Sequence, residues 1–468
     1  MVLEITQETF DSAVKENVEI LGLSEEEALD EAIKQFKAQG VDLGKISTQP
    51  MSKKEFENLT TAIEQLRKLQ ELKGSPEKVN TILEQLKNEC DKGLPQKVAA
   101  GKADLYYILL NTYETFKDKV NRTNVLKALI ALMTKQPDLL DDRGVQFIIN
   151  NLKDHNQDLS LQCLILKWTK VCCILHELNR QKIFEAHILD ILKDFLKDNS
   201  PVELIRDTLS LCRALVLDDD VRVEFGKAHE HARIIATETL CSIMSLLCKF
   251  KGEEQLNYDI MLTLTALMVR TEFCKNVDDA GGLDCIKSVM ESFSSSDKII
   301  RQSFKLIKAL AGNDDCKVHM VKQGYAGGIN DSILNNIENP QTVTAGLAAI
   351  AALTLRNPDN SKAFYEAGAP DVIVNAMKYH MDQKALQKTG SWAIRNMVSR
   401  SKYQTGKFLE LGVEDVLCQD IQKFKDIEYD IKAALRDLGC NVTLKEEWTG
   451  KGGALTTGLT RRDDNKEN

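Results

Sequence analysis

The chain has 468 residues, 43% of them hydrophobic and 28% charged, which suits a packed core with a solvated surface and argues against global disorder. With 8 prolines, 6% aromatic residues and few β-branched runs, the composition favours helices over sheets. The formal charge is −9, but residues 1–45 carry 11 acidic residues against 4 lysines, a net −7. The remaining body is nearly neutral, which argues against nucleic-acid binding.

Residues 1–45 are predicted to form two acidic amphipathic helices, the second opened by a capping box from Ser24 to Glu27. This segment can cap the first repeat through apolar burial, or dock in a basic groove through its charge. We favour capping, because burial outweighs screened surface charge. The apolar residues available for it are Phe10, Val14, Ile33 and Phe36.

Residues 46–92 are helical and lysine-rich, with a break at Gly74–Pro76, and are predicted to be a linker or a degenerate capping repeat. From residue 93 to 440 a nine-residue pattern recurs eight times, at spacings of 43, 43, 51, 43, 43, 44 and 44. Its fourth positions are Gly101, Gly144, His187, Glu238, Gly281, Gly324, Gly368 and Gly412. Its ninth positions are apolar in all copies: Tyr106, Ile149, Leu192, Ile243, Ile286, Ile329, Ile373 and Leu417.

A glycine at the fourth position suits a turn of positive φ after a short helix, and the apolar spacing that follows is that of a buried helical face. Each repeat is therefore predicted to contain a short helix, a turn, a second helix, a loop and a longer third helix. Third-helix residues that share one apolar register are Leu132, Leu215, Leu267, Leu310, Leu353 and Met397. Residues 441–468 are rich in glycine, threonine and charge, and are expected to be a disordered tail.

The glycine-anchored second helix, and a third helix containing Trp392, Ala393 and Asn396, resemble armadillo repeats. Further segments are similar to the armadillo-repeat-containing protein six family over nearly the whole chain: QETFDSAVKENVE, QFKAQGVDL, LDDDVRVEFGKAHEHAR, ALAGNDD, RNPDNS, AALRDLGC and EEWTG. The resemblance implies an all-α, right-handed armadillo-type superhelical solenoid of about eight three-helix repeats. It also implies an interaction module, so we predict a monomeric, non-catalytic scaffold that binds a protein or peptide.

In armadillo proteins the third helices line a concave groove, where a ladder of asparagines and flanking tryptophans holds an extended peptide. Here Asn396 alone occupies the asparagine register, and only Trp168 and Trp392 occupy the tryptophan position, so this form of peptide recognition is in doubt. One position earlier lies a broken basic row, which predicts an acidic or mixed peptide, or a folded partner, as ligand. The alternative is that each base pairs with a local carboxylate. The row consists of Arg213, Lys308, Arg395 and Arg436.

The 51-residue spacing marks an insertion at residues 218–231, and a metal-dependent or unrecognised enzyme centred there is the alternative function. A solvated loop is the favoured interpretation, and we expect neither a cofactor nor a metal. The candidate ligands are Asp218, Asp219, Asp220, Glu224, His229 and His231.

The 12 cysteines contain no C-x-x-C pair, and those in apolar helical stretches are expected to be reduced core residues. The first residues lack the features of a signal peptide, and the apolar stretch at 347–355 is too short to span a bilayer. We therefore expect no membrane association and a cytoplasmic protein that also enters the nucleus. The cysteines assigned to the core include Cys212, Cys241 and Cys248.

Overall fold

The computed structural model describes residues 5–44, 46–48, 51–154 and 158–442, and within them the regular elements are helices. The predicted tail, residues 441–468, lies almost entirely outside the described residues. The chain divides into two compact units, residues 1–289 and 290–468. The all-α, armadillo-type fold class is confirmed.

Unit 1 begins with two helix pairs, followed by the repeats. The pairs are α1 (Gln7–Leu21) with α2 (Glu25–Ala38), and α3 (Lys53–Glu71) with α4 (Pro76–Lys92). The first two repeats contain α5 (Leu94–Lys102), α6 (Leu105–Thr115) and α7 (Lys119–Met133), then the 3-10 helix η1 (Pro137–Leu139), α8 (Asp142–Lys153) and α9 (Leu159–Cys173). The next two contain α10 (Glu177–Glu185), α11 (Ile188–Phe195) and α12 (Val202–Leu215), then α13 (Ala228–Lys249) and α14 (Glu254–Leu267).

The fifth repeat contains α15 (Thr271–Asp279), α16 (Gly282–Ser292) and α17 (Asp297–Leu310), of which α17 belongs to unit 2. The rest of unit 2 contains α18 (Asp314–Lys322), α19 (Tyr325–Asn335) and α20 (Pro340–Thr354), then α21 (Pro358–Glu366), α22 (Ala369–Tyr379) and α23 (Lys384–Val398). The last repeat contains η2 (Lys402–Gln404), α24 (Thr405–Glu410), α25 (Val413–Lys423), η3 (Lys425–Ile427) and α26 (Glu428–Asp437).

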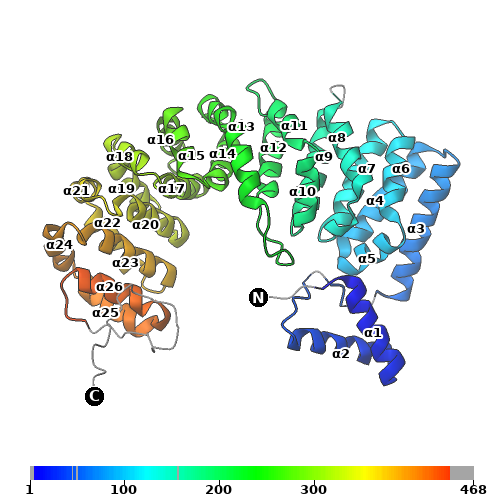
Figure 1. Cartoon of the computed structure of the whole chain (residues 1–468), viewed down its shortest axis with the longest axis horizontal. Helices are drawn as coiled ribbons and strands as arrows, with labels where there is room; N and C mark the ends of the chain where they lie inside the picture. The colour runs from blue at the N-terminus through cyan, green and yellow to red at the C-terminus, as the bar shows by residue number, and fades with distance from the viewer. Residues whose placement is uncertain (1–4, 45, 49–50, 155–157, 443–468) are drawn as a thin grey trace, which may run out of the picture. The chain divides into compact units, whose positions relative to one another are not determined.

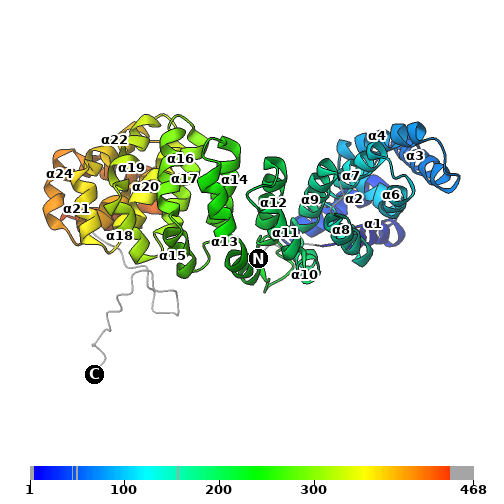
Figure 2. The same cartoon turned by 90° about the horizontal axis from the view of Figure 1, so that it is seen from above.

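The third helices form the continuous layer of each unit. In unit 1, α4 packs on α7, α7 on α9, α9 on α12 and α12 on α14. Two views of the chain show this order along the unit (Figures 1 and 2). In unit 2, α17, α20, α23 and α26 pack in the same way. The predicted third-helix register is confirmed, since Leu132, Leu215, Leu267, Leu310, Leu353 and Met397 are all fully buried.

The predicted turn after the first helix is confirmed at the last four glycines and also at His187, which has a φ of 62°. All eight ninth positions are buried, as expected for the core face of the second helix. The glycines with the left-handed conformation are Gly281, Gly324, Gly368 and Gly412, with φ between 74° and 83°.

The prediction is wrong at the other three copies. Gly101 lies within α5, and Asp104 takes the left-handed conformation instead, with a φ of 59°. Gly144 lies in the first turn of α8, and Glu238 lies inside α13, a continuous helix of 22 residues. In that repeat the first two helices are fused, so no turn is needed.

Gly144 is required for close packing, because a Cβ there would lie 2.1 Å from Oη of Tyr106, whose hydroxyl donates to Asp141. We expect Gly144→Ala to lower the free energy of unfolding by about 1–3 kcal/mol, the usual cost of overpacking. Gly327 and Gly328 in α19 are the matched controls, because a Cβ at either meets nothing within 4 Å. Alanine there stabilises a helix by about 0.5–1 kcal/mol. Urea unfolding of the three variants checks both signs.

The N-terminal helices α1 and α2 have a core of their own. Phe10 is buried against Phe36, with ring centroids 5.8 Å apart, and the cluster around them is built from residues between 5 and 46. The predicted capping box is confirmed, with Ser24 and Glu27 bonding each other's backbone amides. Asp11 of α1 forms an ion pair with Lys102 of α5. The apolar residues assigned to capping the first repeat are thus packed inside this hairpin.

The cysteine prediction holds for Cys212, which is fully buried, but is wrong for two others. Cys241 is exposed on α13. Cys248 is not a free thiol, because it forms a disulfide with Cys285 of α16.

Candidate functional site

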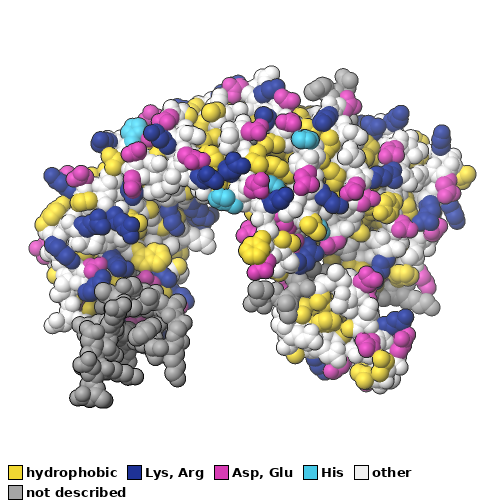
Figure 3. All heavy atoms as spheres, viewed as in Figure 1, with side chains coloured by type: hydrophobic (Ala, Val, Ile, Leu, Met, Phe, Trp, Pro, Cys, Tyr) yellow, Lys and Arg dark blue, Asp and Glu magenta, His cyan; other side chains and the backbone are white. Residues whose placement is uncertain are grey.

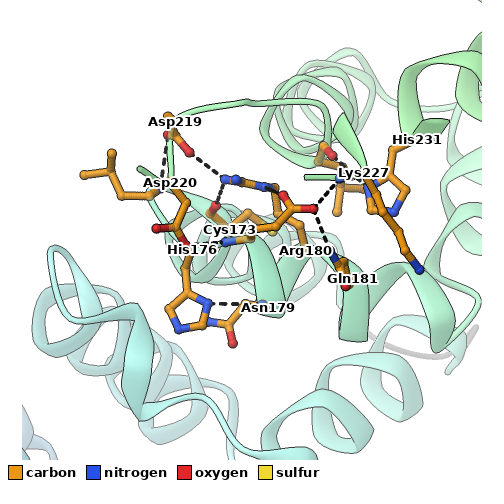
Figure 4. Close-up of polar contacts among 12 residues, drawn as sticks. Cys173, His176, Asn179, Arg180, Gln181, Asp219, Asp220, Lys227 and His231 are labelled. Atoms are coloured by element: carbon orange, nitrogen blue, oxygen red, sulfur yellow. Dashed lines mark hydrogen bonds and ion pairs between the residues drawn. The ribbon is translucent and has the colours of Figure 1, made fainter. Parts of the chain in front are cut away.

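The insertion between α12 and α13 is anchored to the start of α10 (Figure 4). Asp219 Oδ2 accepts from the backbone amide of Leu175 at 3.0 Å, and Asp220 Oδ2 accepts from that of Glu177 at 2.9 Å. Amides at a helix N-terminus have no partner within the helix, so Asp220 caps the first residue of α10, whereas Asp219 holds the segment just before the N-cap residue His176.

Arg180 of α10 lies at the centre of this network and is 1% exposed. Its Nε donates to Glu177 Oε2 at 2.9 Å, and its Nη1 donates to Asp219 Oδ1 at 2.6 Å and to the Cys173 carbonyl at 2.7 Å. Burial opposes ionisation of Glu177, but hydrogen bonds from Gln181, the Lys227 amide and Arg180 hold its pKa below the usual range. The arginine therefore joins the end of α9, the start of α10 and the insertion.

The second end of the insertion is fixed as well. The Lys227 amide donates to Glu177 Oε1 at 2.6 Å, and a Cβ at Gly226 would lie 3.2 Å from the Glu177 carboxylate. Arg222 Nε donates to Asp220 at 2.8 Å, and its Nη1 donates to Asp138 of η1 at 3.0 Å. Although burial raises the pKa of Asp220, this arginine lowers it to about 2 overall. We name these contacts of Arg180, Glu177, Asp219, Asp220, Arg222 and Lys227 the insertion clamp.

Two of the acidic residues proposed as metal ligands, Asp219 and Asp220, are thus bound by arginines and backbone amides. His231 is buried, stacks on Phe184 with ring centroids 4.1 Å apart, and lies with Nδ1 3.2 Å from the Leu215 carbonyl. Burial lowers its pKa. Among the described residues, the three potential ligand atoms that converge within 4.8 Å belong to Cys163, Glu203 and Asp207, on α9 and α12. The predicted ligands of the insertion do not converge.

The different burial of His231 and His229 allows a role in packing to be distinguished from a role in metal binding. We expect His231→Ala to lower the free energy of unfolding by about 1–3 kcal/mol, because a stacked, buried ring is removed. His229 is exposed, so His229→Ala should be neutral. A chelator should leave the melting temperature of the wild type unchanged. A chelator-dependent fall in melting temperature, abolished by His229→Ala, would contradict this interpretation.

In unit 1 the two predicted groove residues do not form a free binding surface. Trp168 is fully buried, and its indole N–H lies 3.0 Å from Sδ of Met133, so the prediction that it lines a groove is wrong. Arg213 lines an open pocket of about 480 Å³ between α9, α12 and α14. Its guanidinium is held by Thr263 at 2.7 Å and by Asp259 at 3.2 Å. The pocket contains equal numbers of acidic and basic residues: Lys167, Glu203, Arg206, Asp207, Arg213 and Asp259.

In unit 2, Arg395 and Arg436 both pair with Asp437, at 3.2 and 3.0 Å. Asn396 donates to the Ala351 carbonyl of the preceding third helix at 2.8 Å, so its amide joins two repeats. Arg213, Arg395 and Arg436 thus each form an ion pair with a nearby carboxylate, as the alternative interpretation of the basic row predicted. Lys308 is exposed on α17.

Trp392 of α23 is 38% exposed, and its side chain is contacted at the indole N–H and over one face of the ring. The indole N–H donates to Asp430 Oδ1 of α26 at 2.8 Å, and Lys388 Nζ lies 5.1 Å from the ring centroid. Lys388 and Asp430 are 3.4 Å apart. In Figure 3, basic side chains gather over α23 and its neighbours, with hydrophobic side chains exposed between them.

Between α17 and α23 lies the face of α20, which carries small side chains. Ala348 occupies the same repeat position as Lys305 of α17 and Trp392 of α23, and Arg301 donates to Gln341 at the start of α20 at 2.6 Å. Lys305 is exposed one turn before Lys308. We name this surface the α17–α23 trough; it comprises Lys305, Lys308, Thr344, Ala345, Ala348, Ala352, Lys388 and Trp392.

Sequence reasoning missed Lys305 and Lys388 of this trough, and also Asp430 of α26, which accepts from the Trp392 indole. The spacing of Lys305 and Lys308 on one face of a helix was a signal that could have identified the first. The contacts of Lys388 and Asp430 with Trp392 join two third helices, and local spacing does not reveal them.

None of the helices in the described part of the chain combines the length and apolar character needed to cross a membrane. A solved engineered protein aligns with 94% of this chain and all of its own, at a TM-score of 0.66 and 14% identity. A structure concerning the interaction between cadherin and β-catenin covers 81% of this chain and 69% of its own, at a TM-score of 0.54 and 13% identity. Both similarities concern the fold alone.

The sequence comparisons are more specific. The family model ARMC6 matches residues 62–457, and the model of the Armadillo repeat-containing protein 6 N-terminal domain matches residues 3–67. The Armadillo repeat-containing protein 6 homolog of Drosophila melanogaster is 40% identical over 96% of this chain and 98% of its own. The Armadillo repeat-containing protein 6 of Homo sapiens is 33% identical over 96% of this chain and 94% of its own. The chain therefore belongs to the armadillo repeat-containing protein 6 family.

Proposed function

We propose that this protein is a non-catalytic scaffold that binds an acidic segment of a partner protein in the α17–α23 trough. The fold is one that typically serves protein–protein interaction through extended surfaces. The observation that carries the proposal is Trp392, an exposed tryptophan held in one orientation, with exposed lysines across a helix of small residues.

The chemistry of the trough selects its ligand. Ala345 and Ala348 of α20 are small and partly exposed, so a peptide backbone could lie against them, and Trp392 offers an apolar ring face for one side chain. Lys305 and Lys308 lie opposite and attract carboxylates. Oriented aromatic residues lose little entropy on binding, which makes them effective anchors.

The unit 1 pocket is a poorer candidate for an acidic ligand. Arg206 and Arg213 there already share Asp259, at 2.9 and 3.2 Å. A partner would have to break these ion pairs and leave a nearly buried carboxylate without its arginines. An acidic ligand could bind Lys305 and Lys308 of α17 without breaking an ion pair of this kind.

A photo-crosslinking side chain at Ala348 tests the proposal in cells. We expect a discrete crosslinked partner at this position and none at Ala367, an exposed alanine after α21. The double change Lys305→Glu with Lys308→Glu should reduce the crosslink at least tenfold, because it places like charges beside an acidic ligand.

Two further variants complete the test. Trp392→Ala should also abolish the crosslink, whereas Lys362→Glu, an exposed change on α21, should retain it. Equal crosslinking at Ala348 and Ala367, or a product indifferent to both the lysine and the tryptophan changes, would reject the trough as the binding surface.

A specific observation favours a second contact surface on the insertion. Val221 and Phe225 are 50% and 84% exposed, although both ends of their loop are held by the insertion clamp. Figure 3 shows hydrophobic side chains exposed at the free end of this loop. A rigid loop that presents an aromatic side chain suits a partner contact. Phe225→Ala should leave the melting temperature unchanged and weaken crosslinking of a partner to a photo-reactive side chain placed at Val221 of the same loop.

A further inference from the structure

One pair of cysteines differs from all the other described thiols. Cys248, in the last turn of α13, is bonded to Cys285 of α16, with Cα atoms 5.4 Å apart and a sequence separation of 37. The bond joins helices of neighbouring repeats and closes a loop that contains α14 and α15.

The start of α16 also approaches α13 at a second point. Gly282, at the start of α16, is so close to α13 that a Cβ there would lie 2.8 Å from Met244 Cε. Apolar side chains of both helices are buried, among them Met244 and Leu247 of α13 and Ile286 and Val289 of α16. The two sulfur atoms are therefore expected to stay adjacent when the bond is reduced, which is the condition for it to form again.

Most other thiols are protected from oxidation. Burial raises the pKa of Cys90, Cys173 and Cys212 to about 12, so almost no thiolate, the reactive form, is present at neutral pH. Cys248 is only partly buried, whereas Cys285 is buried, with 7% of its surface exposed. The pair thus combines one more exposed and one more sheltered cysteine.

We propose that Cys248 and Cys285 are a reversible redox modification site, oxidised by a peroxide and reduced by a dithiol. The Cys248 thiolate attacks one peroxide oxygen, the O–O bond breaks, and a sulfenic acid forms as the other oxygen leaves as water after protonation. The Cys285 thiolate then attacks the Cys248 sulfur, forming the S–S bond and releasing a second water. In the reverse direction one thiolate of a dithiol attacks the Cys248 sulfur and Cys285 leaves as a thiolate; the second thiol of the reagent then attacks its own bonded sulfur, which releases Cys248 and leaves the reagent as a cyclic disulfide.

The structural consequence is a covalent link between neighbouring repeats of unit 1. A cross-link removes conformations from the unfolded chain, so the oxidised form should unfold at a higher temperature. The site rests on the pairing of Cys248 with Cys285 across two repeats and is independent of the trough proposal.

The full chain tests the site directly. Protein reduced with dithiothreitol and then treated with hydrogen peroxide should yield a peptide pair cross-linked through Cys248 and Cys285, with the loss of two hydrogens. Its melting temperature should rise by at least about 3 °C over the reduced form. Cys248→Ser should abolish both effects, whereas Cys241→Ser, an exposed change two turns earlier on the same helix, should retain them.

Two results would overturn the proposal. The first is oxidation that yields no Cys248–Cys285 peptide while the protein remains folded by circular dichroism. The second is a bond that resists millimolar dithiothreitol in the native protein, because such a bond is a permanent structural link. Disulfide mapping of the wild-type protein, oxidised and reduced, decides both. The result therefore does not depend on whether a variant folds.

Discussion

Replacing Arg180 with methionine is expected to lower the free energy of unfolding by about 3–5 kcal/mol, which is the usual cost of removing one member of a buried ion pair. Glu177 would remain 2% exposed without its guanidinium, and Asp219 would lose a partner at 2.6 Å. Urea unfolding followed by circular dichroism measures the loss. Hydrogen exchange should show it first in α10 and in the insertion.

Lys182→Ala is the matched control on the same helix. Its ammonium pairs with Asp142 at 2.9 Å, but both side chains are exposed, so the change should stay within about 0.5 kcal/mol of the wild type. If Arg180→Met were equally mild, the insertion clamp would contribute little to stability, and its loop would have to be held by other contacts.

The free energy of unfolding is expected to fall as the pH rises from about 4 to 7. The cause is the titration of Asp420 of α25. The side chain is fully buried, and neither carboxylate oxygen has a hydrogen-bond partner among the described residues. Burial raises the pKa of Asp420 to about 7. The unfolded chain releases this proton near pH 4 and the folded chain near pH 7, so between these values the folded state holds the extra proton.

Asp420→Asn removes this titration. The variant should exceed the wild type in unfolding free energy by about 2–4 kcal/mol above pH 7, and the difference should shrink towards pH 4. Asp415→Asn, an exposed change on the same helix, should leave the pH profile unaltered. Melting curves at pH 5 and pH 8, with hydrogen exchange in α25 and α26, provide the measurement. A wild type equally stable at both values would contradict an unpartnered ionisable carboxylate at this position.

Much of the fold could be predicted because each repeat is specified by residues that lie close together in sequence. A helix buries residues spaced three and four apart, so Ile286, Ile329 and Ile373 were identified as core before any tertiary contact was known. The left-handed turns at Gly324 and Gly368 follow from glycine's tolerance of positive φ. At Gly144 the same residue type serves a different purpose, because what requires it is Tyr106 from another repeat.

The candidate site was predicted less well. Sequence position placed Trp168 and Trp392 in equivalent registers, yet one is fully buried and the other is 38% exposed. The difference arises from neighbours: Trp168 packs at 5.7 Å from Phe147, a residue of the second helix, whereas Trp392 contacts Asp430 and Lys388 at the surface. Exposure depends on which side chains of adjacent helices fill the space above a ring.

The sequence by itself determined the helical class, the repeat period, the core registers and the family to which this protein belongs, because these depend on spacing along one chain. Only the tertiary structure decided that Asp219 and Asp220 bind arginines and amides, and that Cys248 meets Cys285. It also decided that the lysines of α17 lie across α20 from Trp392. Charge pairing and thiol proximity depend on distances between residues some forty positions apart, and those distances are set by how one repeat packs on the next.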